Sequence, residues 1–252
     1  MTGEGRGLSF GTMAEEYDRW RPSYPDAAVD WLAPIAPATV VEVGAGTGRL
    51  TSLLLSRGIA VEAVEPDPRM RAVLARNNPG ARCHAGHSTA LPVPDGSVDA
   101  VLVADAWHWF DPEATMEEVR RVLKPQGWLG LVWNVAAEPV EPWELALAGA
   151  PDMYDRETKG GPEGVRQHLP LATLDELEFA QFDWVWELTP AHRAANLATT
   201  SMAIAMGPAE RDEWLAAARA ELQELCEGSG RHAMPIRHQA SCTRWTPRST
   251  TV

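Results

Sequence analysis

The stretch VVEVGAGTGRL, residues 40–50, decides the fold of this chain. Its first four residues are typical of a buried strand, and glycines at 44, 46 and 48 then turn the chain into a helical segment. Glycine permits a sharp turn, and it lets a ligand reach main-chain N–H groups that a Cβ would shield. We therefore expect a nucleotide-like ligand at the end of this strand.

The spacing of the glycines separates two kinds of cofactor loop. A dinucleotide fingerprint requires glycine at position 49, where this chain has Arg49, and here the third glycine comes one residue earlier. The acid within the apolar strand, Glu42, is a second unusual feature. Burying its carboxylate costs free energy, so we expect it to have a polar role near the strand end.

A second apolar segment, VEAVEPD at residues 61–67, reaches an acid at Glu65. Adjacent parallel strands end side by side, so the Glu65 carboxylate can accept hydrogen bonds from both hydroxyls of a ribose. This position alone would suit an NAD-dependent oxidoreductase equally well. Such an enzyme is therefore one alternative that the sequence leaves open.

Apolar strands and helical patterns alternate through the first half, which is typical of a parallel sheet wound by crossover helices. We predict strands at 39–43, 60–64, 98–103, 128–133, 182–188 and 236–245. We predict helices at 10–20, 25–34, 48–57, 68–76, 113–123, 191–205 and 208–226. The LKPQG that begins at Leu123 should end the helix before it, and the first two helices could form a lid over the sheet.

Composition narrows the class of protein. A chain of 252 residues can bury one substantial core, and 35 acidic against 22 basic residues give a net charge of −13. That charge would repel a nucleic-acid backbone. The first ten residues, MTGEGRGLSF, do not resemble a signal peptide, and no apolar run is long enough to span a bilayer. We expect a cytoplasmic protein with no membrane or nucleic-acid partner.

Several motifs follow one another in the order seen in a known family. They are YDRWRPSYP at 17–25, VEVGAGTGRL at 41–50, VEAVEPDPRM at 61–70, LPVPDGSVDAV at 91–101, AWHWFDP at 106–112 and VLKPQG at 122–127. Over about residues 10–134 the chain resembles the class I S-adenosylmethionine-dependent methyltransferases. The likeness is to the small-molecule subgroup that includes trans-aconitate methyltransferase-like enzymes.

The resemblance implies an α/β, Rossmann-like domain with a mostly parallel seven-stranded sheet and helices on both faces. We assign one methyltransferase domain to residues 1–252. Its parts would be a helical lid at 10–34, a cofactor-binding core at 35–134, a substrate-side insertion at 135–205, and a closing helix and strand at 206–246.

The resemblance also implies which residues bind S-adenosylmethionine. The methionine and sulfonium portion would contact Gly44, Ala45, Gly46, Ala104 and Asp105. The adenosine would contact Glu65 through its ribose, and Pro66, Met70, Ser88 and Thr89 through its adenine, with Tyr17 closing over the cofactor from the lid. Many relatives place Asp where this chain has His87, so a backbone carbonyl is expected to replace that contact to the adenine amine.

Methyl transfer is an in-line displacement, so the enzyme must hold the nucleophile in line and exclude water. His108, in AWHWF after the predicted strand 98–103, could be the general base, or it could be a hydrogen-bonded pocket residue. Trp107 and Trp109 would point to opposite sides if this segment were extended. No spacing of His, Cys or Asp indicates a metal site.

We expect transfer of the methyl group to an O, N or C nucleophile of a small metabolite, with S-adenosylhomocysteine as product, by a monomer or a homodimer. Another alternative is a cofactor-binding protein that catalyses a different reaction on the same fold. Residues that could line the acceptor pocket are Trp133, Trp143, Met153, Arg166, His168 and Arg193.

Overall fold

Strand β1, Thr39–Val43, is central to the fold because it has a parallel neighbour on each side. It pairs with β2, Ala60–Val64, and with β4, Val98–Ala104. The predicted strands 39–43 and 60–64 are confirmed residue for residue, and β4 continues one residue beyond the predicted 98–103.

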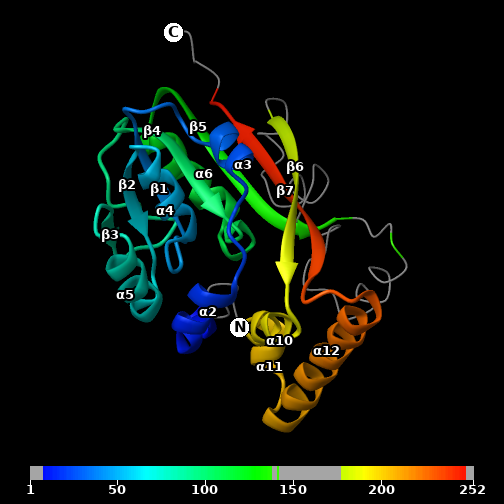
Figure 1. The fold of residues 1–252 in the computed structure, drawn as a ribbon. Coiled ribbons are helices and arrows are strands. Elements are labelled where there is room, and N and C mark those ends of the chain that lie inside the picture. Colours follow the sequence, from blue (N-terminus) through cyan, green and yellow to red (C-terminus); the bar gives the residue numbers. More distant parts are fainter. Residues whose placement is uncertain (1–7, 138–140, 142–176, 248–252) are drawn as a thin grey trace.

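The computed structural model describes residues 8–137, 141 and 177–247, shown in colour in Figure 1. The remaining strands are β3 (Arg82–His84), β5 (Leu123–Ala136), β6 (Leu177–Leu188) and β7 (Met234–Trp245). They form one seven-stranded sheet in the order β3-β2-β1-β4-β5-β7-β6. Only β7 runs antiparallel to its neighbours, which confirms the mostly parallel seven-stranded sheet.

Helices cover both faces of this sheet because successive strand residues point in opposite directions. Val40 faces α3 (Asp26–Leu32) and α4 (Arg49–Ser56), with which it forms one buried cluster. Val41 and Val43 face α6 (Pro112–Val122) in a second cluster. The expected three-layer arrangement is therefore confirmed.

The lid begins with a 3-10 turn, η1 (Leu8–Met13), and continues as α2 (Ala14–Trp20). Helix α2 contacts both α5 (Pro68–Asn77) and α10 (Pro190–Ala198). These helices lie at the end of the sheet to which the β4 arrow points in Figure 1. Because that end is where the parallel strands terminate, the lid covers the edge at which α/β proteins bind ligands.

Several element predictions differ from the structure. Strand β3 was not predicted, β6 begins at Leu177 rather than at residue 182, and the helix predicted at 10–20 begins as the 3-10 turn η1. Strand β5 begins at Leu123 rather than at residue 128, although α6 does end before LKPQG as expected. The single helix predicted at 191–205 is two helices, α10 and α11 (Ser201–Ala205). Thr200 causes this break, because its side chain caps α11 by accepting from the Ala203 amide while its hydroxyl donates to the Leu197 carbonyl.

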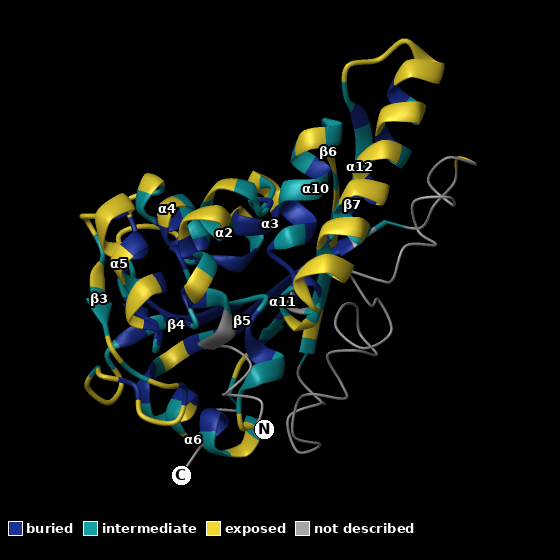
Figure 2. Ribbon diagram, turned by 90° about the horizontal axis from the view of Figure 1, so that it is seen from below, coloured by how far each residue is buried: buried dark blue, intermediate teal, exposed yellow. Residues whose placement is uncertain are grey.

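Helix α12 (Pro208–Ser229) and β7 close the described chain, as predicted for residues 208–226 and 236–245. Most of α12 is exposed on its outer side in Figure 2, and its buried residues are Ala218, Leu222 and Cys226. The substrate-side insertion at 135–205 stays a prediction. Within it, residues 138–140 and 142–176 lie outside the described part of the chain, and with them the candidate pocket residues Trp143, Met153, Arg166 and His168.

Gly48 provides a test of how tightly the loop after β1 packs. Its φ is +90°, and a Cβ there would lie 2.3 Å from Asn78 Nδ2 and 2.4 Å from Leu74 Cδ1. We expect Gly48→Ala to lower the free energy of unfolding by roughly 1–3 kcal/mol more than Gly96→Ala does. Gly96 is a matched control, because its φ is +57° but a Cβ there meets nothing within 4 Å. Equal losses in urea unfolding would contradict this account.

Candidate functional site

The loop after β1 is held against the end of β2. The amides of Gly44 and Ala45 donate to the Val64 carbonyl at 2.9 and 3.1 Å. A Cβ at Gly44 would lie 2.8 Å from the Ala106 Cβ, so only glycine fits there. Gly46 is different, because its φ is +59° and a Cβ would meet nothing within 4 Å. A ligand can therefore approach the backbone at Gly46.

Glu65 follows β2 and turns its carboxylate toward this loop. Its Oε2 accepts from the Gly46 amide at 2.8 Å and its Oε1 from the Asp67 amide at 2.9 Å. Each carboxylate oxygen keeps a second lone pair for another donor. Burial raises the pKa of Glu65, while the two backbone N–H groups oppose that shift. The predicted pair of glycine loop and acid is thus brought together.

Glu42 has the polar partner that the sequence analysis called for. The Thr51 hydroxyl, on α4, donates to Glu42 Oε2, and the Glu42 side chain is buried. Burial raises the pKa of this carboxyl to about 8, and the Thr51 hydrogen bond opposes the rise. Glu42 therefore holds a proton in the folded protein at neutral pH.

The predicted adenine residues lie at several depths. Met70 is buried in a cluster with Ala14 and Val73, against which Phe10 and Tyr17 of the lid pack. Ser88 is buried and accepts a hydrogen bond from the Thr115 hydroxyl at 2.8 Å. Pro66 is half-buried, whereas Thr89 and His87 are exposed. Tyr17 is thus next to Met70, as a residue closing over the site from the lid would be.

Asp105 links β4 to the lid and to β5. It is the one non-glycine residue with positive φ, at 51°, in the described part of the chain. Its Oδ2 accepts from the Tyr24 hydroxyl at 2.7 Å, and its Oδ1 accepts from the Asn134 amide at 3.2 Å. Burial raises the pKa of Tyr24 well above its usual range, so its hydroxyl stays a donor. Ala104, the preceding residue, is half-buried at the end of β4.

The segment Asp18–Tyr24, which we call the lid linker, is tied to several elements at this edge. Arg49, on α4, donates to the carbonyls of Asp18 and Pro22. Asn134 Nδ2 donates to the Ser23 carbonyl and Asn196 Nδ2, on α10, to the Trp20 carbonyl, each at 3.0 Å. Sequence reasoning missed Tyr24, Asn134 and Asn196. An amide within the apolar segment WLGLVWNV was the available signal for Asn134.

His108 lies in a 3-10 turn, η2 (Trp107–Trp109), and not in an extended segment. The extended backbone on which we based opposite directions for the two tryptophans is therefore not present. Trp107 is buried, and Trp109 packs against the same cluster. Hydrogen bonds from Trp109 N to the Ala106 carbonyl and from Phe110 N to the Trp107 carbonyl close the turn. The His108 ring is half-buried, with its centroid 4.5 Å from that of Trp109.

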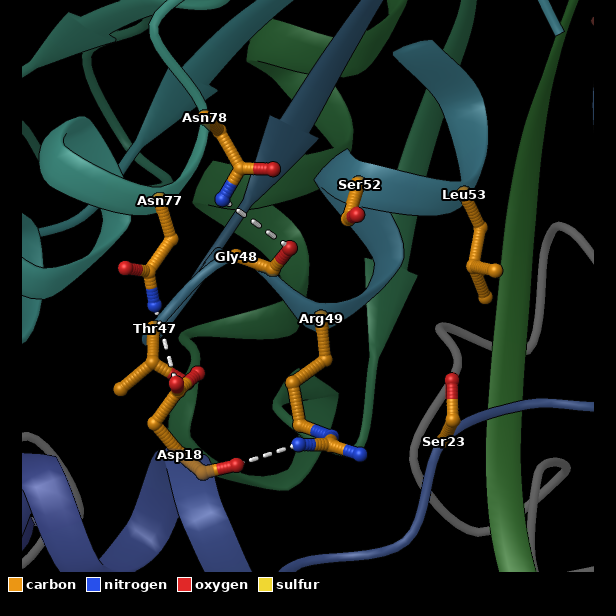
Figure 3. Close-up of a pocket in the computed structure, with 9 residues that line it drawn as sticks. All are labelled: Asp18, Ser23, Thr47, Gly48, Arg49, Ser52, Leu53, Asn77 and Asn78. Carbon is orange, nitrogen blue, oxygen red and sulfur yellow. Dashed lines mark hydrogen bonds between the residues drawn. The ribbon is translucent and has the colours of Figure 1, made fainter. Parts of the chain in front are cut away.

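A cavity of about 230 Å³ opens on the outer side of the loop (Figure 3). The residues that line it are Asp18, Ser23, Thr47, Gly48, Arg49, Ser52, Leu53, Asn77 and Asn78. None of the predicted cofactor-binding residues is among them. The cavity thus neighbours the predicted cofactor crevice without being part of it.

Two further findings concern other classes of site. In the described ranges no three His, Cys, Asp or Glu side chains gather as a metal ion would require. Also within those ranges, no helix has the length and apolar character needed to cross a bilayer.

The sheet order, the glycine loop and the acid after β2 define the class I, Rossmann-like methyltransferases. A family model described as a methyltransferase domain matches residues 41–131. An uncharacterised methyltransferase of Mycobacterium tuberculosis is 44% identical over 183 residues, which are 73% of this chain and 72% of that protein. An uncharacterised methyltransferase-like protein of Schizosaccharomyces pombe is 41% identical over 195 residues, or 75% of this chain and 68% of that protein.

A solved structure shares the fold. It is a candidate type II methyltransferase from Anaeromyxobacter dehalogenans, 24% identical, with a TM-score of 0.64 over 90% of this chain and 97% of that one. The chain belongs to the S-adenosylmethionine-dependent methyltransferase family.

Glu42 predicts a specific pH dependence of stability. Its pKa is about 8 when folded, against an ordinary value of 4.5, so the folded state binds the extra proton between these values. The contribution of Glu42 to the free energy of unfolding is fully present below about pH 4.5 and is lost as the pH rises toward 8. Glu42→Gln removes that loss. The free energy of unfolding of the variant should therefore rise relative to that of the parent by at most about 1.4 kcal/mol per pH unit. Urea unfolding from pH 5 to 9 measures this, and a difference between variant and parent that stays flat over this range would contradict it.

Proposed function

We propose that this protein binds S-adenosylmethionine between the glycine loop and Glu65 and transfers its methyl group to a small-molecule acceptor. One observation carries the proposal. The open approach at Gly46 lies beside a buried carboxylate whose Oε2 is 2.8 Å from the Gly46 amide. The Gly46 backbone and the Glu65 carboxylate thus lie together at the carboxyl edge of the sheet.

The residues present fit this cofactor. A Cβ at Gly46 would extend into the space that the ligand needs, and positive φ favours glycine there in any case. Glu65 keeps lone pairs for two ribose hydroxyls while its backbone bonds fix its direction. Asp105, at the end of β4, adds a carboxylate at the same edge of the sheet, where the positively charged end of the cofactor would lie.

The chemistry requires orientation more than acid or base strength. S-adenosylmethionine, when bound, supplies an electrophilic methyl group on a sulfonium. The protein must then hold the acceptor nucleophile in line with that bond and keep water out. The lid linker supplies the cover, because Arg49, Asn134 and Asn196 hold its carbonyls from three different elements.

His108 is our candidate for the general base. It follows β4 by four residues and Asp105 by three, and it lies within the motif AWHWFDP. A base is needed when the nucleophile is a hydroxyl or a protonated amine. In that case the imidazole would take the proton as the new bond to the methyl carbon forms.

The acceptor is proposed to be a small metabolite with an O, N or C nucleophile. The net charge of −13 opposes a nucleic-acid substrate. S-adenosylhomocysteine would be the product. The trans-aconitate-like subgroup, the cytoplasmic location and the choice between monomer and homodimer stay predictions.

Removal of the Glu65 carboxylate tests the cofactor site. We expect Glu65→Ala to raise the Kd for S-adenosylhomocysteine about 10- to 100-fold, because hydrogen bonds to a charged acceptor are lost. Glu62→Ala, on the same chain segment but paired with Arg82 and His84, is the matched control and should change little. Calorimetry measures both variants. Failure of the parent to bind S-adenosylhomocysteine, or preferential binding of NADH, would overturn the proposed function.

A second variant tests the base. His108→Ala should lower turnover at least about tenfold with an acceptor that the parent methylates, a modest loss for a general base. Its Kd for S-adenosylhomocysteine should stay close to that of the parent, because the cofactor contacts lie elsewhere. Steady-state rates across pH 6 to 9 check this. Equal turnover in the two proteins at every pH would remove His108 from the mechanism.

A further inference from the structure

Two buried asparagines hold the lid linker and leave one side-chain atom each without a partner. Asn134 is 2% exposed and Asn196 is fully buried. Each donates its Nδ2 to a backbone carbonyl of the linker, of Ser23 and Trp20 respectively. Among the described residues, neither Oδ1 has a hydrogen-bond partner.

The identity of these unpaired atoms is secure on chemical grounds. A carbonyl can only accept, so the amide group facing Ser23 or Trp20 must be the NH2 and not the oxygen. Both unpaired atoms are therefore acceptors. Whatever satisfies them must bring an O–H or an N–H.

An unpaired donor lies on the same side of the sheet. Asn134 pairs with Ala240, and Ala240 pairs with Phe182, which is two positions from Trp184, so Asn134 and Trp184 share one face of the sheet. The Trp184 Nε1–H is buried and lacks an acceptor within the described residues. This face thus has one acceptor, Asn134 Oδ1, and one donor, Trp184 Nε1, without partners among the described residues, and Asn196 on α10 adds a second acceptor.

Native proteins leave few buried polar atoms unpaired, because each costs about 1–3 kcal/mol. Here four lie between the lid linker, α10 and the face formed by β5, β7 and β6, namely Asn134 Oδ1, Asn196 Oδ1, Trp184 Nε1 and His192 Nε2. Their location matters, because Asn134 also binds Asp105 at the end of β4 through its main chain. In the sheet, β1 and β2 lie on one side of β4 and bear the proposed cofactor residues, whereas β5 lies on the other side of β4. The β5 side of β4 is therefore where we place the acceptor, next to the proposed cofactor residues.

Aromatic rings line the same region. The centroid of the Trp184 ring lies 5.1 Å from that of His238, and the Trp186 centroid lies 5.0 Å from that of His192. Flat rings of this kind favour a flat ligand.

We infer that Asn134, Asn196 and Trp184 form the acceptor site, and that the acceptor is a planar aromatic molecule bearing a hydroxyl or amino group. This inference rests on the proposed function. The hydroxyl or amino hydrogen binds an asparagine Oδ1, and a lone pair on the same or a neighbouring atom accepts from the Trp184 indole. We take this oxygen or nitrogen as the nucleophile.

One titratable side chain of this region, His238, is uncharged at neutral pH. Burial lowers the pKa of His238 to about 4, and the Arg193 charge lowers it further, while its hydrogen bond to the Ile236 carbonyl opposes the shift. His238 is therefore neutral near pH 7. Arg193 is buried on α10 and has an interaction partner of its own, so we do not count it toward the ligand.

Equilibrium dialysis with two matched probes tests the inference. 1-Naphthol has the hydroxyl hydrogen, and 1-methoxynaphthalene has the same ring and oxygen without it. In the presence of saturating S-adenosylhomocysteine, we expect 1-naphthol to bind the parent about tenfold more tightly than the ether, as one buried hydrogen bond would cause. trans-Aconitate, a non-aromatic acid, should bind more weakly than 1-naphthol.

Two variants distinguish the two kinds of contact. Asn134→Leu removes the acceptor, so it should raise the Kd for 1-naphthol about tenfold and leave the Kd for the ether unchanged. Trp184→Phe keeps an aromatic ring but removes the N–H donor, so it should weaken the binding of both probes. Trp214→Phe, on α12, is the control and should change neither. Trp184→Phe and Trp214→Phe should bind S-adenosylhomocysteine within about twofold of the parent, which also shows that they fold. Asn134→Leu also removes a tie to the lid linker, so urea unfolding and not cofactor affinity checks that it folds.

The inference fails if the parent binds 1-naphthol no better than the ether, if trans-aconitate binds more tightly, or if both variants match Trp214→Phe. Should Asn134→Leu not fold, Trp184→Phe alone decides. Failure of the proposed function would look different, because the parent would then not bind S-adenosylhomocysteine. Dialysis of the probes without it would still report on the site itself.

Discussion

The hydrogen bond from the Gly46 amide to Glu65 is the contact on which the rest of the site depends. It forms only because β1 and β2 pair in a register that places Val43 beside Val64. A shift of one residue would turn the side chain after β2 to the other face of the sheet. The Val64 carbonyl, which accepts from Gly44 and Ala45, holds the loop in that register. Sheet pairing and cofactor geometry are thus one constraint.

The lid linker extends this constraint across the carboxyl edge. Its backbone carbonyls accept from side chains on α4, β5 and α10, and its Tyr24 reaches Asp105 after β4. Most of these hydrogen bonds are accepted by backbone carbonyls of the linker, so they do not depend on the identity of the linker's own side chains. The same contacts orient two asparagines, and each keeps an oxygen for another partner. The proposed cover over the cofactor and the proposed wall of the acceptor site are in this way built from one short segment.

Local patterns explain why much of the core was predictable. Strands 39–43 and 60–64 alternate with helices over short distances, and the glycines and Glu65 lie at the strand ends. Contacts between distant segments were not predictable. Tyr24 and Asp105 are 81 residues apart, and Asn134 and Ser23 are 111 apart. The η2 turn was missed for a similar reason, because Trp107 and Trp109 both pack into a cluster formed by distant strands.

By itself the sequence determined that this chain makes a glycine loop after one strand and an acid after the next, because both depend on neighbours along the chain. It therefore determined the family. Only the tertiary structure decided which polar side chains meet at the carboxyl edge, since β7 must enter between β5 and β6 before Trp184 shares a face with Asn134. The physical reason is that the hydrogen-bond partners of a buried amide come from distant segments of the chain. Which of its atoms are paired within the described residues is therefore decided only when these segments pack together.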